Sequence, residues 1–598
     1  MNQHQLRELI AAVKAGRVSR RTFVRQMVGL GLTAPLANQL LANAGLAQMA
    51  GSSDYKPTKA GGGGALKTLL WQGPTLLNPH FAVGSKDQEG SRIFYEPLAA
   101  WDSDGDLMPV LAAEIPEVEN GGVAPDGMSV TWKLKKDVLW HDGRPFTADD
   151  VVFNWEYAAD PATAAATIGS YQDVTVEKID PFTVRVHFKK PTPFWADAFV
   201  GALGMVIPKH LFEAYKGSNS REASANLKPV GTGPYRFVDF KPGDLVKGER
   251  NPSYHMPNRP YFDTIELKGG GDAVSAARAV IQTGEYDYAW NVQVEDEILT
   301  KLESGGNAKG HVEFVPGSWV EHIQLNSTDP WTEVDGERSS IKTKHPLLSD
   351  PSVRQALKLL VDRASVQAQI YGRAAVTTAN FLNAPARFAS KSTSWDFDID
   401  KAKQVLEQAG WKRQADGIRA KNGKQLKLVF QTSINAPRQK TQAIIKQACQ
   451  KAGIDVELKS VTASVYFSSD AANPDTYAKF YSDLQMYQVN LLQPDPGPFM
   501  RQFVSWEIAS KNNKWQGRNI TRWRSNEYDQ IFHTAEVELD LVKRAGLFVA
   551  MNNMVVEDGV VIPVVNRRWV AAMSKNLKAT LSPWDNDFWN LKDWYREV

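Results

Sequence analysis

The stretch from Pro125 to Asn154 constrains the fold most strongly, because turn, strand, turn and helix signals follow one another there in a consistent order. A Pro-Asp-Gly turn opens it, and apolar residues then alternate with polar ones over 130–134, which predicts a strand with one buried face. A second turn at 141–143 leads to Thr147, whose side-chain oxygen can cap the first turn of a helix. The two aspartates at 149 and 150 suit the positive end of that helix dipole. We therefore expect a rigid structural module here.

The length and the aromatic content indicate several lobes around a ligand site. A chain of 598 residues is too long for one core, so we expect about two to four lobes. Eighteen Trp and 17 Tyr suit a ligand cleft, although many of them can also fill a large core. The single cysteine, Cys449, excludes a disulfide framework, a Cys-rich zinc site and a Cys-ligated iron–sulfur cluster. Its helical surroundings predict a small buried side chain and not a nucleophile.

The N-terminus predicts export. Arg20, Arg21 and Phe23 lie in a twin-arginine motif, which an interrupted apolar run at 27–41 and small residues suitable for cleavage follow. We interpret residues 1–47 as a twin-arginine signal peptide, since polar and proline positions in the run argue against a permanent membrane span. A chance Arg-Arg pair in an amphipathic N-terminal helix is the alternative.

Removal of residues 1–47 would change the formal net charge from +2 to −3, because six basic residues and one acidic residue leave with it. Nothing in that balance calls for nucleic acid or an anionic membrane as a partner. Residues 48–65, with their run of four glycines, are predicted to be a flexible leader.

Several motifs resemble those of one protein family. Asp126-Gly127, His141-Asp142-Gly143 and the run from Thr147 to Val151 are similar to the signature of the family 5 extracytoplasmic solute-binding proteins. These are the dipeptide-, oligopeptide- and nickel-binding receptors of ABC importers. The Gly-Thr-Gly-Pro-Tyr sequence at 231–235 and the helix that starts after Asp350 extend the resemblance over nearly the whole mature chain. Asp137 departs from the pattern, since the family commonly has glycine there.

The resemblance implies an α/β fold of the periplasmic-binding-protein type II. Two large lobes would be joined by a two-crossing hinge, and a small extra domain would belong to the first lobe. Lobe I would comprise residues 66–110, residues 228–320 and, as the C-terminal return, residues 561–598. The small extra domain would span residues 111–227, and lobe II would span residues 321–560.

Catalytic chemistry has little support. The ten histidines form no zinc-hydrolase motif, and no Gly-x-Ser-x-Gly elbow is present. Paired carboxylates, such as Asp149 with Asp150 or Asp495 with Glu507, leave a secreted hydrolase of the glycosidase type as the alternative function. A twin-arginine-exported redox protein would need a cofactor site, which the sequence does not reveal. We therefore expect no enzyme activity, no catalytic residues, no metal and no cofactor.

Ligand candidates follow from the expected position of the cleft between the lobes. Trp71 follows the first strand and Trp319 lies beside the first crossing, where each ring would stack on a ligand or fill the core. The second group of candidates lies in one segment of the second lobe: Asn490, Leu492, Gln493 and Asp495.

The segment around Leu492 predicts an unusual ligand. Peptide-binding relatives carry an aspartate about three residues before a similar Asp-Pro step, where it pairs with the ammonium of the peptide N-terminus. Alignment on Asp495-Pro496 places Leu492 there, and a buried ammonium without a carboxylate is costly. We therefore expect a capped or modified peptide, a sugar-like solute or another metabolite. A register in which Asp495 itself serves would overturn this hypothesis.

The resemblance implies a periplasmic receptor that captures a small organic solute, most readily a peptide-like one. It would present this solute to the ABC permease subunits in the inner membrane, and we expect it to act as a monomer.

Overall fold

The computed structural model describes residues 57–597 with the exceptions of 469, 471 and 492, together with isolated positions between 9 and 27. The predicted export residues Arg20 and Arg21, and the predicted ligand residue Leu492, therefore lie outside the described residues. Phe23 is described and is fully buried. No helix among the described residues has the length and apolar character needed to cross a membrane.

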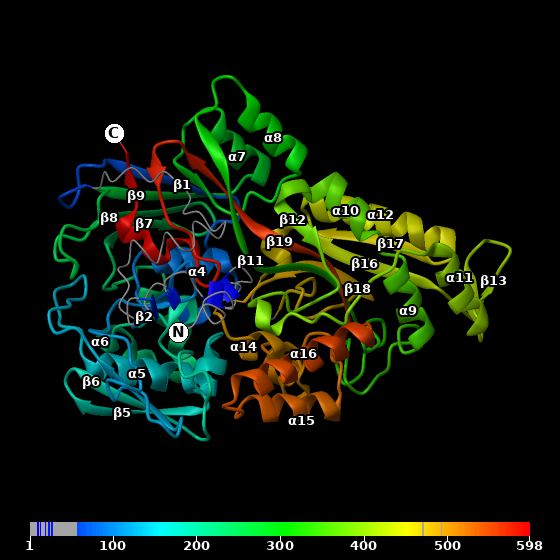
Figure 1. Ribbon diagram of the computed structural model, residues 1–598, viewed down its shortest axis with the longest axis horizontal. Helices are drawn as coiled ribbons and strands as arrows, with labels where there is room; N and C mark the ends of the chain where they lie inside the picture. The colour runs from blue at the N-terminus through cyan, green and yellow to red at the C-terminus, as the bar shows by residue number, and fades with distance from the viewer. Residues whose placement is uncertain are drawn as a thin grey trace.

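One mixed sheet runs through the described part of the molecule and organises it (Figure 1). Parallel pairing joins β1 to β9 and β10, whereas the strands at the middle of the sheet are antiparallel. In spatial order the strands are β17 (Asp455–Val461), β16 (Lys427–Ser433), β18 (Leu484–Val489), β11 (Gly310–Leu325), β19 (Val561–Ser574), β10 (Tyr288–Ala289), β1 (Ala65–Leu70), β9 (Thr264–Gly269), β8 (Leu245–Arg250) and β7 (Tyr235–Lys241), and β12 (Ala375–Thr377) pairs with β19.

The two longest strands, β11 and β19, connect two lobes. They pair antiparallel from Gly310 opposite Ser574 to Gln324 opposite Val561. One end of the pair packs into cores that contain β1 and β9, and the other end packs into a core that contains β16 and β18. The pairing shifts between Val315 and Trp319, where Pro316 supplies no backbone N–H. Figure 1 shows both strands passing from one lobe to the other.

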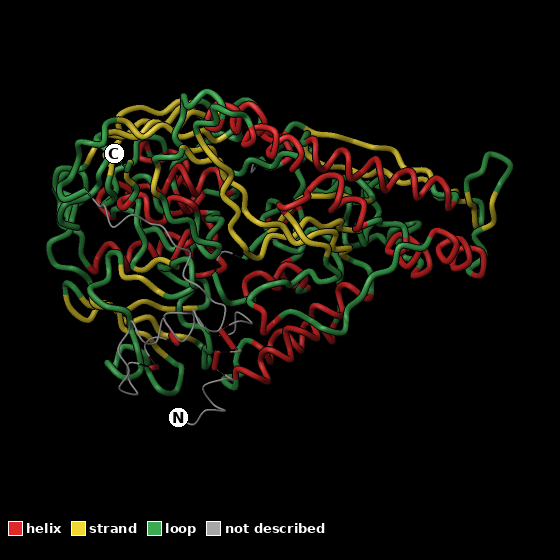
Figure 2. Tube along the Cα trace, turned by 45° about the horizontal axis from the view of Figure 1, so that its top comes forward, coloured by secondary structure: helices red, strands yellow, loops and turns green. Residues whose placement is uncertain are grey.

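The first lobe contains β1 and β7–β10, and the second contains β16–β18. The helices of the first lobe are α4 (Ser85–Arg92), α7 (Ala273–Ile281) and α8 (Asp296–Ser304). Those of the second lobe are α9 (Pro351–Leu359), α10 (Arg363–Val366), α11 (Ile399–Gln408), α12 (Ala436–Ala452), α13 (Ala463–Tyr466), α14 (Gly497–Met500), α15 (Asn526–Ala535) and α16 (Leu541–Glu557). Figure 2 shows the strands in yellow continuing between the red helices of the two lobes.

The stretch at 125–154 forms the predicted module beside the first lobe. Strand β4 (Ser129–Lys133) joins the sheet order β4-β6-β5 with β6 (Thr183–Phe188) and β5 (Val174–Asp180). Helix α5 (Ala148–Ala159) begins after Thr147, which forms a capping box with Asp150. The predicted strand, turn and N-cap are therefore confirmed, and this small sheet with α5 is called the extra module below.

The remaining elements are short. Small sheets pair β2 (Ala99–Trp101) with β3 (Leu107–Pro109), β20 (Leu577–Lys578) with β21 (Tyr595–Arg596), and β14 (Arg419–Lys421) with both β13 (Lys412–Arg413) and β15 (Lys424–Gln425). Helix α6 (Lys209–Phe212) follows the extra module. Strand β19 lies in the expected C-terminal return, and it continues to Ser574 through residues that pack in the first lobe.

Candidate ligand cleft

A cavity of about 850 Å³ lies between the two lobes. Residues that follow β1 and β10, the start of α4 and the 161–172 loops line it from the first lobe and the extra module. The end of β18 and the loops at 467–479 and 506–518 line it from the second lobe. A volume of this order accommodates a small organic ligand or a short peptide.

Tryptophans form the wall on the side of the first lobe. The ring centroids of Trp71 and Trp290 are 6.4 Å apart, and those of Trp290 and Trp569 are 5.5 Å apart. All three line the cavity, and the indole N–H of Trp71 donates to the carbonyl of Asn291 at 2.8 Å. The wall therefore presents rigid apolar ring faces, and the contacts between the rings and the hydrogen bond to Asn291 fix their orientation.

Trp319 takes the core position, one of the two that the sequence left open for it. Its ring stacks on Trp569 at a centroid distance of 5.3 Å, and the side chain is only 4% exposed. It does not belong to the residues that line the cavity. Trp319 thus supports the cleft wall through Trp569.

The candidates after β18 reach the cavity, but their polar groups are already engaged. Asn490, Gln493 and Asp495 all line it. The Gln493 amide donates to Asp197 at 3.2 Å. Asp495 forms a two-pronged ion pair with Arg544 and also accepts the N–H of Gly497 at 2.8 Å. With its charge matched in this way, Asp495 lacks the free carboxylate that an incoming ammonium would need.

A buried ion cluster at the hinge was not predicted from the sequence. Glu321 of β11 accepts hydrogen bonds from Arg438 of α12 at 3.0 and 3.2 Å and from Arg567 of β19 at 3.3 Å. Gln293 donates to the same carboxylate at 2.6 Å. Burial opposes ionisation, but the two guanidinium groups hold the pKa of Glu321 below its ordinary value. Arg438 and Gln293 line the cavity. The available signal was that Glu321 alternates in register with the apolar residues Trp319, Ile323 and Leu325 and so shares their face of the strand.

Polar contacts also bridge the rim of the cleft. Lys190, next to the extra module, pairs with Glu536 beyond α15 at 2.8 Å. Arg501 pairs with the same carboxylate at 3.2 Å and donates to the carbonyl of Gly169 at 3.1 Å. These contacts join the extra module to the second lobe, so they stabilise the closed arrangement of the two lobes.

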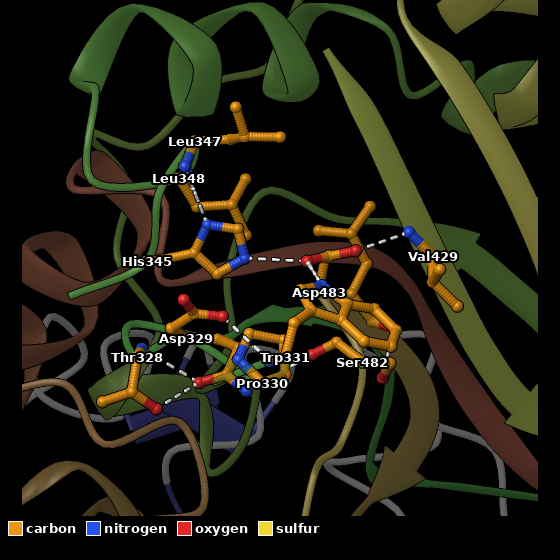
Figure 3. Close-up of polar contacts among 12 residues, drawn as sticks. Thr328, Asp329, Pro330, Trp331, His345, Leu347, Leu348, Val429, Ser482 and Asp483 are labelled. Atoms are coloured by element: carbon orange, nitrogen blue, oxygen red, sulfur yellow. Dashed lines mark hydrogen bonds and ion pairs between the residues drawn. The ribbon is translucent and has the colours of Figure 1, made fainter. Parts of the chain in front are cut away.

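A His–Asp pair in the second lobe resembles half of a catalytic triad but is fully engaged in structural contacts (Figure 3). The Nε2 of His345 lies 2.9 Å from Asp483, and its Nδ1 accepts the backbone N–H groups of Leu347 and Leu348 at 3.1 and 2.8 Å. Asp483 also accepts the N–H of Val429 at 2.6 Å. Since Nδ1 accepts two N–H groups, Nε2 carries the proton and the ring has no free lone pair for a general base.

The other chemical candidates are structural as well. Burial raises the pKa of the Cys449 thiol to about 12, which leaves it unreactive. Asp149 pairs with Lys178 at 2.7 Å, and Asp150 caps α5. Burial lowers the pKa of His141 to about 4, and its ring contacts the backbone of the 231–233 turn. Among the described residues, no group of three or more His, Cys, Asp or Glu side chains could hold a metal ion.

Two α/β lobes, two connecting strands and a cavity between them define a hinged binding protein. The sequence profile of the bacterial extracellular solute-binding proteins, family 5 (middle region), matches residues 106–511. The chain therefore belongs to this family, whose members are the solute-binding components of ABC importers.

The relatives agree with this assignment at low identity. The chain is 26% identical over 530 residues to the oligopeptide-binding protein AppA of Bacillus subtilis (strain 168), which covers 87% of this chain and 90% of AppA. It is 25% identical over 508 residues to the glutathione-binding protein GsiB of Escherichia coli (strain K12), which covers 84% of this chain and 89% of GsiB. These relatives are binding proteins and not enzymes.

Solved structures show the fold. The structure of NikZ from Campylobacter jejuni in complex with Ni(L-His) matches with a TM-score of 0.75 at 23% identity, over 89% of this chain and 99% of NikZ. That of AppA with a nonapeptide matches with a TM-score of 0.75 at 24% identity, over 91% of this chain and all of AppA. The fold is thus that of the type II periplasmic binding proteins.

Proposed function

We propose that this protein captures a small organic solute in the cleft between its lobes and presents it to the permease subunits of an ABC importer in the inner membrane. The observation that carries the proposal is the cavity of about 850 Å³, which residues of both lobes line and which β11 and β19 border. A ligand there would contact both lobes at once and would favour the closed state, since only differential affinity shifts such an equilibrium.

The solute is proposed to be peptide-like, as the named ligands of AppA and GsiB are an oligopeptide and glutathione. It would not present a free amino terminus in the usual way. Leu492 occupies the aligned position, and both oxygens of Asp495 are paired with Arg544. The tryptophan wall of Trp71, Trp290 and Trp569 would cover apolar or ring-shaped parts of the solute.

The site of action is proposed to be the periplasm, after export through the twin-arginine route. This proposal rests on the twin-arginine motif with Arg20, Arg21 and Phe23 and on the apolar run that follows it. The protein would act there as a monomer without a cofactor. Lobe I would comprise residues 66–110, 228–320 and 561–598, the small extra domain residues 111–227, and lobe II residues 321–560.

Native mass spectrometry of the purified mature protein tests the function. We expect a small molecule bound at one copy per chain, released on denaturation and chemically unchanged. A reaction product in the cleft would favour the secreted hydrolase. Peptides with free amino termini would overturn the inference from Leu492 and Asp495 but not the receptor function.

A further inference from the structure

One lysine faces the cleft without a counter-ion. Lys479 lines the cavity and is only 6% exposed, yet its ammonium makes no hydrogen bond or ion pair with any residue that the structure describes. It lies 4.4 Å from the centroid of the Trp515 ring and 6.0 Å from that of Tyr481. The rings stabilise the cation in part, but they offer no acceptor for its N–H groups.

No carboxylate compensates this charge. Asp470 is the acidic residue whose field acts on Lys479, and it is exposed and beyond ion-pair distance. One of its oxygens accepts the N–H of Ala472 at 2.8 Å in a local turn. Desolvation lowers the pKa of Lys479, and the charge of Asp470 opposes this shift.

A second donor next to Lys479 is also unsatisfied. The indole N–H of Trp515 is buried and has no hydrogen-bond acceptor among the described residues. Trp515 lines the cavity and has a φ of 56°, which is strained for a bulky side chain. The preceding Lys514 is left-handed as well, with a φ of 53°. A residue that lines the cleft thus carries a buried, unsatisfied donor on a strained backbone.

The carboxylates around the cavity do not supply the missing acceptor. Glu321 is matched by Arg438 and Arg567, and Asp495 is matched by Arg544. Glu507 also lines the cavity, but the cation with which it interacts electrostatically is Arg518. Ionisable groups with shifted pKa values in a cleft are a recognised feature of functional sites.

We propose that Lys479 and Trp515 together bind an oxyanion of the solute, either a carboxylate or a phosphate. The N–H groups of both side chains would donate to it, and the charge-assisted bond would supply a counter-ion that the protein's own side chains do not provide. This inference rests on the proposed function and specifies its ligand as an anion, bound through its negative end and not through an ammonium.

Titration calorimetry on the mature protein tests this with three matched probes. They are an N-acetylated tripeptide with a free carboxylate, its C-terminal amide, and the amide with phosphoserine as the last residue. If Lys479 binds a carboxylate, the acid should bind at least tenfold more tightly than the amide. If the site takes phosphate, the phosphorylated amide should show the advantage instead.

Variants assign the effect to this site. Lys479→Met should abolish the advantage of the anionic probe, and Lys479→Arg should keep most of it. Trp515→Phe retains the ring but removes the N–H, so it should reduce the advantage by a few fold. Lys424→Met is the matched control, since this exposed lysine of the second lobe does not line the cavity, and it should leave the advantage unchanged.

The outcomes separate the two proposals. Equal binding of all three probes, or an equal loss for all three in Lys479→Met, would overturn the oxyanion site while solute binding stands. Binding of none of them would overturn the peptide-like solute, and this inference with it.

Discussion

Two cation sites at the same cleft differ in how their charge is compensated. Glu321, Arg438 and Arg567 sit on regular elements at the hinge, and the carboxylate accepts bonds from both guanidinium groups. Lys479 and Trp515 sit on loops of the second lobe, and their donors have no acceptor among the described residues. The first site is complete within the protein, whereas the second needs a ligand.

A third buried group shows another form of compensation. Asp587 accepts bonds from Tyr288 and from Trp569, and Glu89 accepts the backbone N–H groups of residues 587 and 588. Burial raises the pKa of Asp587 to about 7 and that of Glu89 well above its ordinary value, and repulsion by Asp587 adds to the shift of Glu89. Buried charge in this molecule is thus balanced by a counter-ion, by a proton or, as we propose, by the solute.

The largest effect is expected where the counter-ion is removed. Glu321→Gln leaves two buried guanidinium groups with no carboxylate, so we predict a loss of about 3–5 kcal/mol in the free energy of unfolding. Urea unfolding followed by circular dichroism measures it. Glu297→Gln, which alters an exposed ion pair with Lys301, should unfold like the wild type. A loss below about 1 kcal/mol at Glu321 would show that the cluster is not structural.

Proton compensation should appear as pH dependence. Between about pH 4 and pH 7 the folded protein keeps a proton on Asp587 that the unfolded chain has lost, since the folded pKa is the higher one. The free energy of unfolding therefore falls as the pH rises through this window, by about 1.4 kcal/mol per pH unit for one proton. Asp585 is also buried, and Arg92 lies 3.9 Å from it, so the charges of both residues act on the same buried site.

Measurement of the free energy of unfolding at pH 5 and at pH 7.5 tests this pH dependence. Asp587→Asn keeps an acceptor oxygen but cannot titrate, so its stability should fall by about 2 kcal/mol less than that of the wild type over this interval. Asp173→Asn, at an exposed pair with Lys189, should keep the wild-type slope. An unchanged slope in Asp587→Asn would contradict proton compensation.

A smaller effect is expected at the rim, where water screens the charges. Lys190→Met removes the pair with Glu536 across the cleft. We predict that the free energy of unfolding falls by less than about 1 kcal/mol. Ligand affinity should fall two- to fivefold, because the closed state loses a contact. Calorimetry with the ligand that native mass spectrometry identifies provides the measurement. Lys189→Met, whose partner Asp173 lies near it in the extra module, is the control. Equal affinities of wild type and Lys190→Met would remove the rim contact from the closure mechanism.

The smallest effect on stability is predicted for Lys479→Met in the ligand-free protein. Removal of a cation that has no counter-ion should leave the free energy of unfolding unchanged or raise it by up to about 1 kcal/mol. Lys86→Met gives the contrast, since Lys86 is similarly buried, lines the same cavity and pairs with Asp87 at 2.7 Å. That variant should lose about 2 kcal/mol. A comparable loss for Lys479→Met would mean that the protein itself satisfies this cation.

The sequence predicted features that depend on neighbouring residues. The Thr147 cap and the strand at 129–133 follow from local turn chemistry and side-chain alternation, and both are present. The position of Trp71 at the cleft followed from its place after the first strand. The orientation of Trp319 did not, because a register shift in β11 directly precedes it.

The charged clusters of the cleft could not be read from the sequence. Glu321, Arg438 and Arg567 come from three segments more than 100 residues apart in sequence. Lys479 and Trp515 lie on loops without regular periodicity, and their contact depends on how both loops pack. Non-local pairings of this kind are set by the tertiary structure and not by local patterns.

The crystal structure of the complex with the ligand that native mass spectrometry identifies tests the central claim most directly. The account predicts a solute between Trp71, Trp290 and Trp569, with an oxyanion within hydrogen-bond distance of the ammonium of Lys479 and the indole N–H of Trp515. A ligand ammonium paired with Asp495, or a ligand bound outside the cleft, would contradict it.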